Sequence, residues 1–553
     1  MKFSNKILSQ TITQLCLNYE VNNIVISPGS RNAPLTIGFT ENHSFKNYSI
    51  VDERCAAFFA LGLAQQLKEP VALVCSSGSA LLNYFPAIAE AFYSDIPLIV
   101  ISADRPEHLL EIGDGQTIQQ ENVFGNHILY NANCKEGDSF QRDNEIEINR
   151  ALRIAKNQKG PVHINVPFSE PLYETVDKLQ VDVSNYSEEK VEPLKEDLSE
   201  YFPIWEKAKK KLVLVGVLTP NSIQQKIIDA LIEDESVIVF TETTSNLHHN
   251  DCISAIDQLI APLEEHDFET IQPDLLLTFG GMVISKKVKS FLRNYSPKHH
   301  WHVDDKKAYD TYFALSNHVK MSPSTFLEDI LSNTYKLKSD YKNTLLAIKE
   351  YRLKRHKKYL EIIPFSDFKA FSTIFKNIPS NFQLQLSNSA TVRYAQLFNL
   401  ESSLQVFCNR GTSGIDGSTS TAIGAAIASD LPTVFITGDL SFLYDSNALW
   451  NSYIPKNFKI IVINNGGGGI FRILPGEKNT EKFDTYFETK HSHKAKNLCE
   501  MYGINYNSTS NVKDLEERIS IFFQNNDQPQ LLEIFTPSKK NDQVLLDYFK
   551  FIK

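Results

Sequence analysis

Short apolar runs, each closed by a polar or glycine-rich turn and followed by a helical pattern, recur along the 553 residues of the chain. The clearest example covers residues 433–471. Two strand patterns there flank residues 441–453, whose mixed apolar and polar positions predict a helix. The first strand ends at Asp439 and the second at Asn465. If the strands are parallel neighbours, both side chains emerge at the carboxyl edge of one sheet, where open α/β sheets bind ligands.

The same alternation divides the chain into three α/β units, each expected to hold a doubly wound parallel sheet with helices on both faces. We place them at residues 1–182, 200–340 and 365–553. An acidic linker is expected at 183–200, and a lysine-rich helix at 335–363 is expected to lead into the third unit. The predicted strands are 23–27, 48–51, 71–75, 97–102 and 161–166, then 212–217, 237–241, 275–279 and 300–303, then 382–386, 404–408, 434–436, 460–463 and 531–535. Predicted helices include 56–65, 80–93 and the small-residue segment 418–429.

Composition narrows the classes of function. Apolar residues make up 42% and charged residues 22%, as in globular proteins, and a net charge of −10 argues against nonspecific nucleic-acid binding. The seven cysteines form no CxxC pair, so we expect reduced, mostly buried thiols in a cytoplasmic protein. Residues 1–15 lack a signal-peptide core, and no apolar run approaches the roughly 20 residues of a membrane helix. We therefore expect no membrane insertion.

The turns after the two central strands of the third unit offer ligands for a hard cation. Asp439 supplies a carboxylate, Asn465 an amide oxygen, and the glycines at 466–469 allow backbone to approach a ligand closely. Such oxygen ligands suit Mg²⁺, which often bridges to phosphates. The alternative is an ordinary βαβ unit with a polar turn at each end.

These turns resemble the signature of the thiamine diphosphate (ThDP) decarboxylases and carboligases, whose three-domain layout the chain shares. The resemblance implies a ThDP cofactor, with Mg²⁺ or alternatively Mn²⁺ held by Asp439, Asn465 and the Gly467 carbonyl. It also implies a pyrimidine-binding first unit, a diphosphate-binding third unit, and active sites shared between subunits of a homodimer or a dimer of dimers. Further cofactor contacts are implied for Gly414, Ile415, Leu440, Ser441, Ile470 and Phe471.

Glu53 is the candidate catalytic residue. It follows a predicted strand and precedes an apolar helix, so on the residues alone it could equally be a helix N-terminal carboxylate. In the family, a carboxylic acid beside the aminopyrimidine shares a proton with a ring nitrogen. The resemblance assigns that role to Glu53.

Four further motifs narrow the resemblance. Residues 27–35 (SPGSRNAPL), 103–106 (ADRP), 409–411 (NRG) and 438–442 (GDLSF) resemble the 2-succinyl-5-enolpyruvyl-6-hydroxy-3-cyclohexene-1-carboxylate synthases of menaquinone biosynthesis, the MenD family. Leu440, which replaces a glycine usual in other ThDP enzymes, is ordinary in that branch. The resemblance implies that 2-oxoglutarate is decarboxylated on ThDP and that the succinyl carbanion adds to isochorismate.

Both of these substrates carry two carboxylates, so their site requires cationic and hydroxyl donors. Ser389 and Arg393, four residues apart, lie on one face of a predicted helix. Lys287 is an alternative to Lys286, and each arginine taken alone is more often a solvated surface residue. No histidine falls in a motif that assigns it a role. The candidate substrate-binding residues are Ser30, Arg31, Arg105, Gln116, Lys286, Ser389, Arg393 and Arg410.

Two other functions compete with this one. Another ThDP enzyme, such as an acetolactate synthase or a 2-oxoacid decarboxylase, would share the fold, but no clear flavin loop is visible and the paired arginines favour a dianionic donor. A noncatalytic protein on a degenerate fold would be expected to lack Glu53, Asp439 or Asn465, and all three are present.

Overall fold

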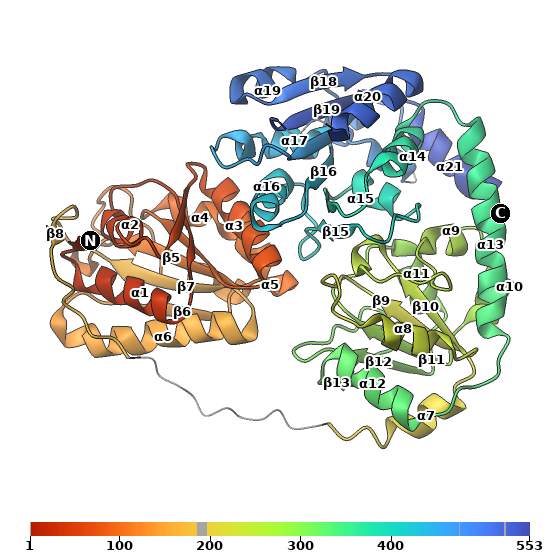
Figure 1. The fold of residues 1–553 in the computed structure, drawn as a ribbon, viewed down its shortest axis with the longest axis horizontal. Helices are drawn as coiled ribbons and strands as arrows, with labels where there is room; N and C mark the ends of the chain where they lie inside the picture. Colours follow the sequence, from red (N-terminus) through yellow and green to blue (C-terminus); the bar gives the residue numbers. More distant parts are fainter. Residues whose placement is uncertain (1, 185–195, 475, 525–526) are drawn as a thin grey trace.

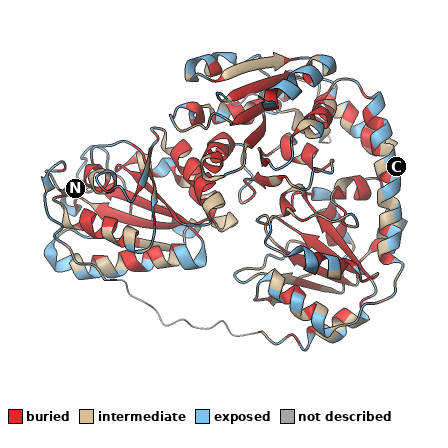
Figure 2. Cartoon of the chain, viewed as in Figure 1, coloured by how far each residue is buried: buried red, intermediate tan, exposed pale blue. Residues whose placement is uncertain are grey.

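The computed structural model describes residues 2–184, 196–474, 476–524 and 527–553. Three parallel sheets form three bodies, with the first unit on the left, the third at the top and the middle unit at the lower right (Figure 1). The described residues also include a two-stranded antiparallel sheet of β1 Phe3–Ser4 and β8 Thr175–Val176. Buried strands lie between helices whose outer faces are exposed (Figure 2). The predicted fold class of three α/β parallel-sheet domains is confirmed. The predicted linker at 183–200 falls largely on residues 185–195, which lie outside the described residues.

The first and third sheets have six parallel strands each and the same topology. Numbered within its own unit, each follows the order 2-1-3-4-6-5, and the middle sheet follows 2-1-3-4-5. The first sheet is β3 Lys46–Ser49, β2 Asn23–Ile26, β4 Val71–Cys75, β5 Leu98–Asp104, β7 Val162–Pro167 and β6 Tyr130–Asn133. The middle sheet is β10 Val237–Thr241, β9 Lys211–Val215, β11 Leu275–Phe279, β12 His299–Val303 and β13 Asn317–Val319. The third is β15 Gln405–Cys408, β14 Gln383–Leu386, β16 Thr433–Gly438, β17 Lys459–Asn464, β19 Gln530–Phe535 and β18 Asn505–Thr509.

Helices cover both faces of each sheet, so the central strands are apolar on both sides. Those of the first unit are α1 Ile7–Asn18, α2 Ala33–Thr40, α3 Glu53–Leu67, α4 Ser79–Asn83, α5 Phe85–Ser94 and α6 Gln141–Gln158. The middle unit has α7 Tyr201–Lys207, α8 Gln225–Ile232, α9 Ile256–Ile260, α10 Glu265–Ile271, α11 Lys286–Asn294 and α12 Pro323–Asn333. The third has α14 Asp367–Asn377, α15 Ala390–Ala395, α16 Ser418–Ala428, α17 Asp439–Tyr444, α18 Glu481–Tyr486, α19 Lys496–Tyr502, α20 Val512–Gln524 and α21 Asn541–Phe551.

The first and third units share a hydrophobic core along α3 and α16. A Cβ at Gly62 of α3 would lie 2.1 Å from the Thr421 carbonyl oxygen, and one at Gly424 of α16 would lie 2.0 Å from that of Phe59. Glycine therefore lets the two helices approach with backbone against backbone. This contact fixes the start of α3, which carries Glu53, relative to the third sheet.

Helix α13, Tyr341–Ile362, joins the middle unit to the third and runs along the right edge of Figure 1. His356 on this helix hydrogen-bonds through Nδ1 to the Tyr548 hydroxyl of α21 at 2.8 Å. The predicted helix at 335–363 is thus present, beginning six residues later than expected.

Two helix predictions were partly wrong. The helix expected at 441–453 ends at Tyr444, followed by a short 3-10 turn at Ser446–Leu449. Between them the buried Asp445 carboxylate accepts the Ser420 backbone N–H at 2.7 Å, which directs this residue away from a regular helical path. The helix expected at 80–93 is divided at Tyr84 into α4 and α5, because Pro86 has no N–H to continue the hydrogen-bond ladder.

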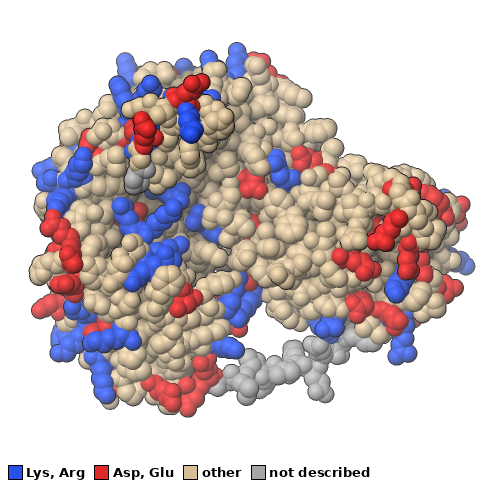
Figure 3. Space-filling view, turned by 180° about the vertical axis from the view of Figure 1, so that it is seen from behind, with Lys and Arg blue, Asp and Glu red and all other residues tan. Residues whose placement is uncertain are grey.

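All seven cysteines are free and buried, as expected from their spacing. Among the described residues, no helix is both long and apolar enough to cross a membrane. Viewed from behind, basic side chains gather on the middle and third units, whereas acidic ones gather on the outer end of the first (Figure 3).

Candidate active site

Asp439 lies at the carboxyl edge of the third sheet, where β16 and β17 end side by side. Asp439 is 4% exposed, and its Oδ2 accepts the backbone N–H groups of Gly466 and Gly467 at 2.9 and 3.0 Å. Oδ1 accepts the N–H of Leu440 at 2.7 Å. These bonds hold the turn at Gly438-Asp439 after β16, the acidic turn, against the turn at residues 465–469 after β17, the glycine turn.

Asn465 supplies a side-chain oxygen to which none of the described residues donates a hydrogen bond. Its Nδ2 donates to Oδ2 of the buried Asp367 at 3.0 Å, while its Oδ1 is buried. The Gly467 carbonyl accepts the Gly469 N–H at 3.0 Å and has a second lone pair. A carboxylate, an unpaired amide oxygen and a carbonyl fit a hard cation such as Mg²⁺.

His491 also contacts Asp439, and sequence reasoning missed it. Its Nε2 lies 3.3 Å from Oδ2 of Asp439, and its side chain is 7% exposed. The adjacent Asp439 carboxylate raises the pKa of His491. No motif surrounds this histidine in the sequence, so only the fold places it beside the acidic turn.

The residues expected around an organic cofactor lie near this turn. The Ser441 hydroxyl donates to the Ile415 carbonyl at 2.7 Å, linking the start of α17 to the loop before α16. Gly414 in that loop accepts the Asn388 Nδ2 at 2.7 Å. Ile415 and Phe471 are 37% and 39% exposed, which leaves apolar surface uncovered beside the acidic turn. Ile470 is half-buried.

Glu53 is the first residue of α3 and is half-buried, with Asp52 capping the helix through the Cys55 N–H at 3.2 Å. Its Oε2 accepts the Asn83 Nδ2 at 3.4 Å. Arg54, the next residue, donates to the carbonyl of Tyr444, the last residue of α17, at 2.8 Å. The third unit of the same chain therefore orients the start of α3, although Glu53 itself bonds within the first unit.

The four candidates of the first unit lie in loops that follow its strands, and both arginines bond to other loops of the same unit. Arg31 is buried; it donates to the Phe168 carbonyl at 2.8 Å and pairs with Glu170 at 3.2 Å. Arg105 donates to the Gly115 carbonyl at 2.9 Å, beside Gln116. Ser30 and Gln116 are exposed. Among the residues that the structure describes, these contacts stay within the first unit.

The middle and third units bring a group of cations together. Arg393 donates to the Ser389 carbonyl at 2.6 Å, and Arg410 to Asn388 Oδ1 at 2.6 Å. Burial, followed by the neighbouring Arg410, lowers the pKa of Arg393. The two guanidinium groups therefore lie close enough to repel each other, which favours an anionic ligand between them.

Lys289 joins this group from α11 and was not predicted. Burial lowers its pKa, and the nearby Arg410 and Lys286 act in the same direction. The Lys287 ammonium lies over the Phe549 ring at 4.9 Å. Burial raises the pKa of Glu242 to about 7, and this carboxylate accepts the Ile284 and Ser285 N–H groups ahead of α11.

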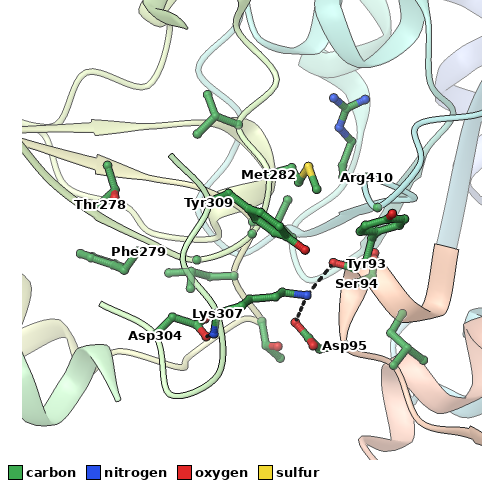
Figure 4. A pocket seen from close by; sticks show the side chains of 18 of the residues that line it. Tyr93, Ser94, Asp95, Thr278, Phe279, Met282, Asp304, Lys307, Tyr309 and Arg410 are labelled. Atoms are coloured by element: carbon green, nitrogen blue, oxygen red, sulfur yellow. Dashed lines mark hydrogen bonds and ion pairs between the residues drawn. The ribbon is translucent and has the colours of Figure 1, made fainter. Parts of the chain in front are cut away.

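A pocket of about 650 Å³ opens between the three units, bordered by Arg410 from the third unit (Figure 4). Lys307 of the middle unit reaches across it to Asp95 at 2.9 Å and to the Tyr93 carbonyl at 3.3 Å. Its lining includes Arg410 but neither Asp439 nor Asn465. It is therefore a separate hollow from the acidic turn.

Comparison with known families places all three units. Residues 7–127 match the thiamine pyrophosphate enzyme N-terminal TPP binding domain, and residues 389–534 match the C-terminal TPP binding domain. Residues 176–384 match the middle domain of thiamine pyrophosphate enzymes. Thiamine pyrophosphate is another name for ThDP. The chain thus has both halves of a ThDP-binding enzyme.

Relatives and a solved structure agree. The 2-succinyl-5-enolpyruvyl-6-hydroxy-3-cyclohexene-1-carboxylate synthase of Flavobacterium psychrophilum is 58% identical over 98% of both chains, and that of Porphyromonas gingivalis is 36% identical over 96% of this chain and 95% of its own. A benzoylformate decarboxylase from Polynucleobacter necessarius, at 15% identity, aligns with a TM-score of 0.71 over 97% of this chain and 99% of its own, which shows the fold. The chain therefore belongs to the thiamine pyrophosphate enzyme family and, within it, to the 2-succinyl-5-enolpyruvyl-6-hydroxy-3-cyclohexene-1-carboxylate synthases.

Proposed function

We propose that this chain releases CO₂ from 2-oxoglutarate and joins the remaining succinyl group to isochorismate, giving the cyclohexene carboxylate after which its relatives are named. The pathway would be menaquinone biosynthesis. One observation carries the proposal: a buried acidic turn and an unpaired amide oxygen at one sheet edge, in a chain whose full length matches these synthases.

Mg²⁺, with Mn²⁺ as an alternative, is assigned to the carboxylate of Asp439, the Oδ1 of Asn465 and the carbonyl of Gly467. The unpaired Oδ1 supports this assignment, because a buried amide oxygen without a donor is costly unless a ligand satisfies it. The Asp439 carboxylate also supports the assignment, because hydrogen bonds from the Gly466 and Gly467 N–H groups hold it in place. An ion there would neutralise the cofactor's diphosphate.

When bound, ThDP supplies the nucleophilic carbon that makes decarboxylation and carbon–carbon bond formation possible. The residues of this chain bind and orient the cofactor. We assign contact with the cofactor to Gly414, Ile415, Leu440, Ser441, Ile470 and Phe471, and proton sharing with the pyrimidine ring to the Glu53 carboxyl. The exposed apolar surfaces of Ile415 and Phe471 would be covered by cofactor and protein.

We assign the binding of substrate carboxylates to Arg393, Arg410 and Lys286. Lys289 lies beside them. Mutual repulsion among these neighbouring cations is relieved when a dianion enters, so 2-oxoglutarate fits better than a monoanion such as pyruvate. Ser389 stands next to Arg393 on the same segment. Ser30, Arg31, Arg105 and Gln116 are assigned to the same substrates from the first unit.

A homodimer, alone or paired into a tetramer, is proposed to complete each site. Within one chain, the hydrogen bond of Glu53 goes to Asn83 of its own unit, and the contacts of Arg31 and Arg105 stay there too. A second copy could bring these residues against the third unit of its partner. The buried, free thiols support a reducing, cytoplasmic location.

Cofactor-dependent thermal stabilisation tests the site. Saturating ThDP and Mg²⁺ should stabilise the protein by roughly 2–4 kcal/mol, because only the folded chain binds them. Asp439→Ala should abolish that stabilisation. A melting temperature unchanged by cofactor in the unsubstituted protein would contradict the proposed site.

A further inference from the structure

Asp367 is a buried carboxylate that no sequence motif marks and that lies at the start of α14, 98 residues before Asn465. Its side chain is 3% exposed. One carboxylate oxygen accepts the Thr536 hydroxyl at 2.5 Å, and the other accepts the Asn465 Nδ2 at 3.0 Å. Its backbone N–H donates to the Asn541 Oδ1 at 2.8 Å. Two segments distant in sequence, at Asn465 and at residues 536–541, therefore fix the position of Asp367.

Asp367 bonds to Asn465, and the two ends of an asparagine amide differ in what they can bind. Nδ2 only donates and Oδ1 only accepts, and a cation binds the oxygen. An ionised carboxylate accepts hydrogen bonds and cannot donate them, so Asp367 selects the Nδ2 end of Asn465. The Oδ1 end is left buried, with no hydrogen-bond partner in the part of the chain that the structure describes.

We propose that Asp367 is the positioning residue of the cation site: it holds the Asn465 amide so that Oδ1, and not Nδ2, faces the bound metal ion. This inference rests on the proposed function, which assigns Oδ1 of Asn465 to the metal. Groups that orient metal ligands commonly change metal affinity by 10- to 100-fold when removed. Asp367 itself touches neither metal nor substrate.

A purely structural role is the competing explanation, since Asp367 also anchors α14 to Thr536 beyond β19. The two roles use different oxygens of one carboxylate. Thr536→Val removes the anchoring bond and leaves the bond to Asn465 in place. Asp367→Asn keeps an amide oxygen that can still accept from Asn465, whereas Asp367→Ala removes every acceptor.

The test is a Mn²⁺ titration of the full-length protein with saturating ThDP, followed by the electron paramagnetic resonance signal of free Mn²⁺. Asp367→Ala should raise the Mn²⁺ dissociation constant at least about tenfold. The Mn²⁺ dissociation constant of Asp367→Asn should stay within about threefold of that of the unsubstituted protein, and that of Thr536→Val within about twofold. If Asp367→Ala does not fold, Asp367→Ser, whose shorter side chain places no acceptor at Asn465, replaces it in the comparison.

Two results would overturn the inference while leaving the proposed function intact. The first is that the unsubstituted protein binds Mn²⁺ and the Asp367→Ala variant has a Mn²⁺ dissociation constant within twofold of it. The other is an equal loss in Thr536→Val and Asp367→Ala, which would reduce Asp367 to an anchor of α14. An unsubstituted protein that binds no Mn²⁺ would overturn the proposed metal site itself, and the role of Asp367 with it.

Discussion

The carboxylate of Glu90 accepts the backbone N–H of Gly411 at 2.7 Å, across the boundary between the first and third units. It also accepts the N–H and the hydroxyl of Thr412 at 2.6 and 2.8 Å, and the Ser94 hydroxyl at 2.8 Å. Glu90 is 1% exposed. A helix of the first unit thus holds the turn that carries Arg410.

Glu90→Gln should destabilise this junction. A glutamine places an NH₂ group where a carboxylate oxygen accepted, so at least one buried N–H of the turn loses its acceptor, at a cost of about 2 kcal/mol. The melting temperature should fall by roughly 4–8 °C. Ser94→Ala is the control, because the Ser94 hydroxyl bonds the same carboxylate but its removal leaves the N–H groups of the turn with their acceptor. Equal melting temperatures for Glu90→Gln and the unsubstituted protein would count against a holding role for Glu90.

Gly62→Ala tests the contact between α3 and α16. Helix propensity alone predicts stabilisation by about 1 kcal/mol, since alanine favours a helix over glycine. The structure predicts the opposite sign, because the new Cβ would lie 2.1 Å from the Thr421 carbonyl oxygen. We expect a destabilisation of about 1–3 kcal/mol by thermal unfolding. A more stable variant would show that the helices do not pack as described.

The sequence predicted central strands well because both faces of such strands are buried. The central strands β4 and β11 are almost entirely apolar, and their predicted bounds agree with the structure. The strands β6 and β18 at sheet edges were missed, since YNAN and NYNST are polar and carry no apolar run. Edge strands pair on one side only, so their sequences need not be apolar throughout.

Some residues of the candidate site could be identified from the sequence, and others could not. Asp439 and Asn465 carry local signatures, each following a strand, and could be singled out from sequence. Asp367, Glu90 and His491 could not, because their relation to the site is made by folding. Glu90, for instance, meets Gly411 from 321 residues away. The roles assigned to individual site residues stay predictions.

Glu53→Gln should keep ThDP binding and lose nearly all turnover. A glutamine fills the same volume beside the pyrimidine, but it cannot share a proton with the ring nitrogen. Cofactor binding is measured by thermal stabilisation and turnover by CO₂ release. Near-normal turnover would remove Glu53 from the catalytic role.

Arg393→Ala should impair use of 2-oxoglutarate far more than cofactor affinity. Removing one partner of a buried charge pair costs about 2 kcal/mol or more, which corresponds to roughly a thirtyfold loss in kcat/KM for 2-oxoglutarate. Stabilisation by ThDP and Mg²⁺ should be nearly unchanged. A variant that loses ThDP binding but retains its KM for 2-oxoglutarate would place Arg393 at the cofactor instead.

The most direct test of the proposed reaction is CO₂ release with ThDP, Mg²⁺ and 2-oxoglutarate, measured with and without isochorismate, while the product is followed by mass. We predict isochorismate-dependent release of CO₂ and a product whose mass equals isochorismate plus 2-oxoglutarate minus CO₂. Turnover with pyruvate and none with 2-oxoglutarate would contradict the proposed donor, while leaving the ThDP-enzyme fold unaffected.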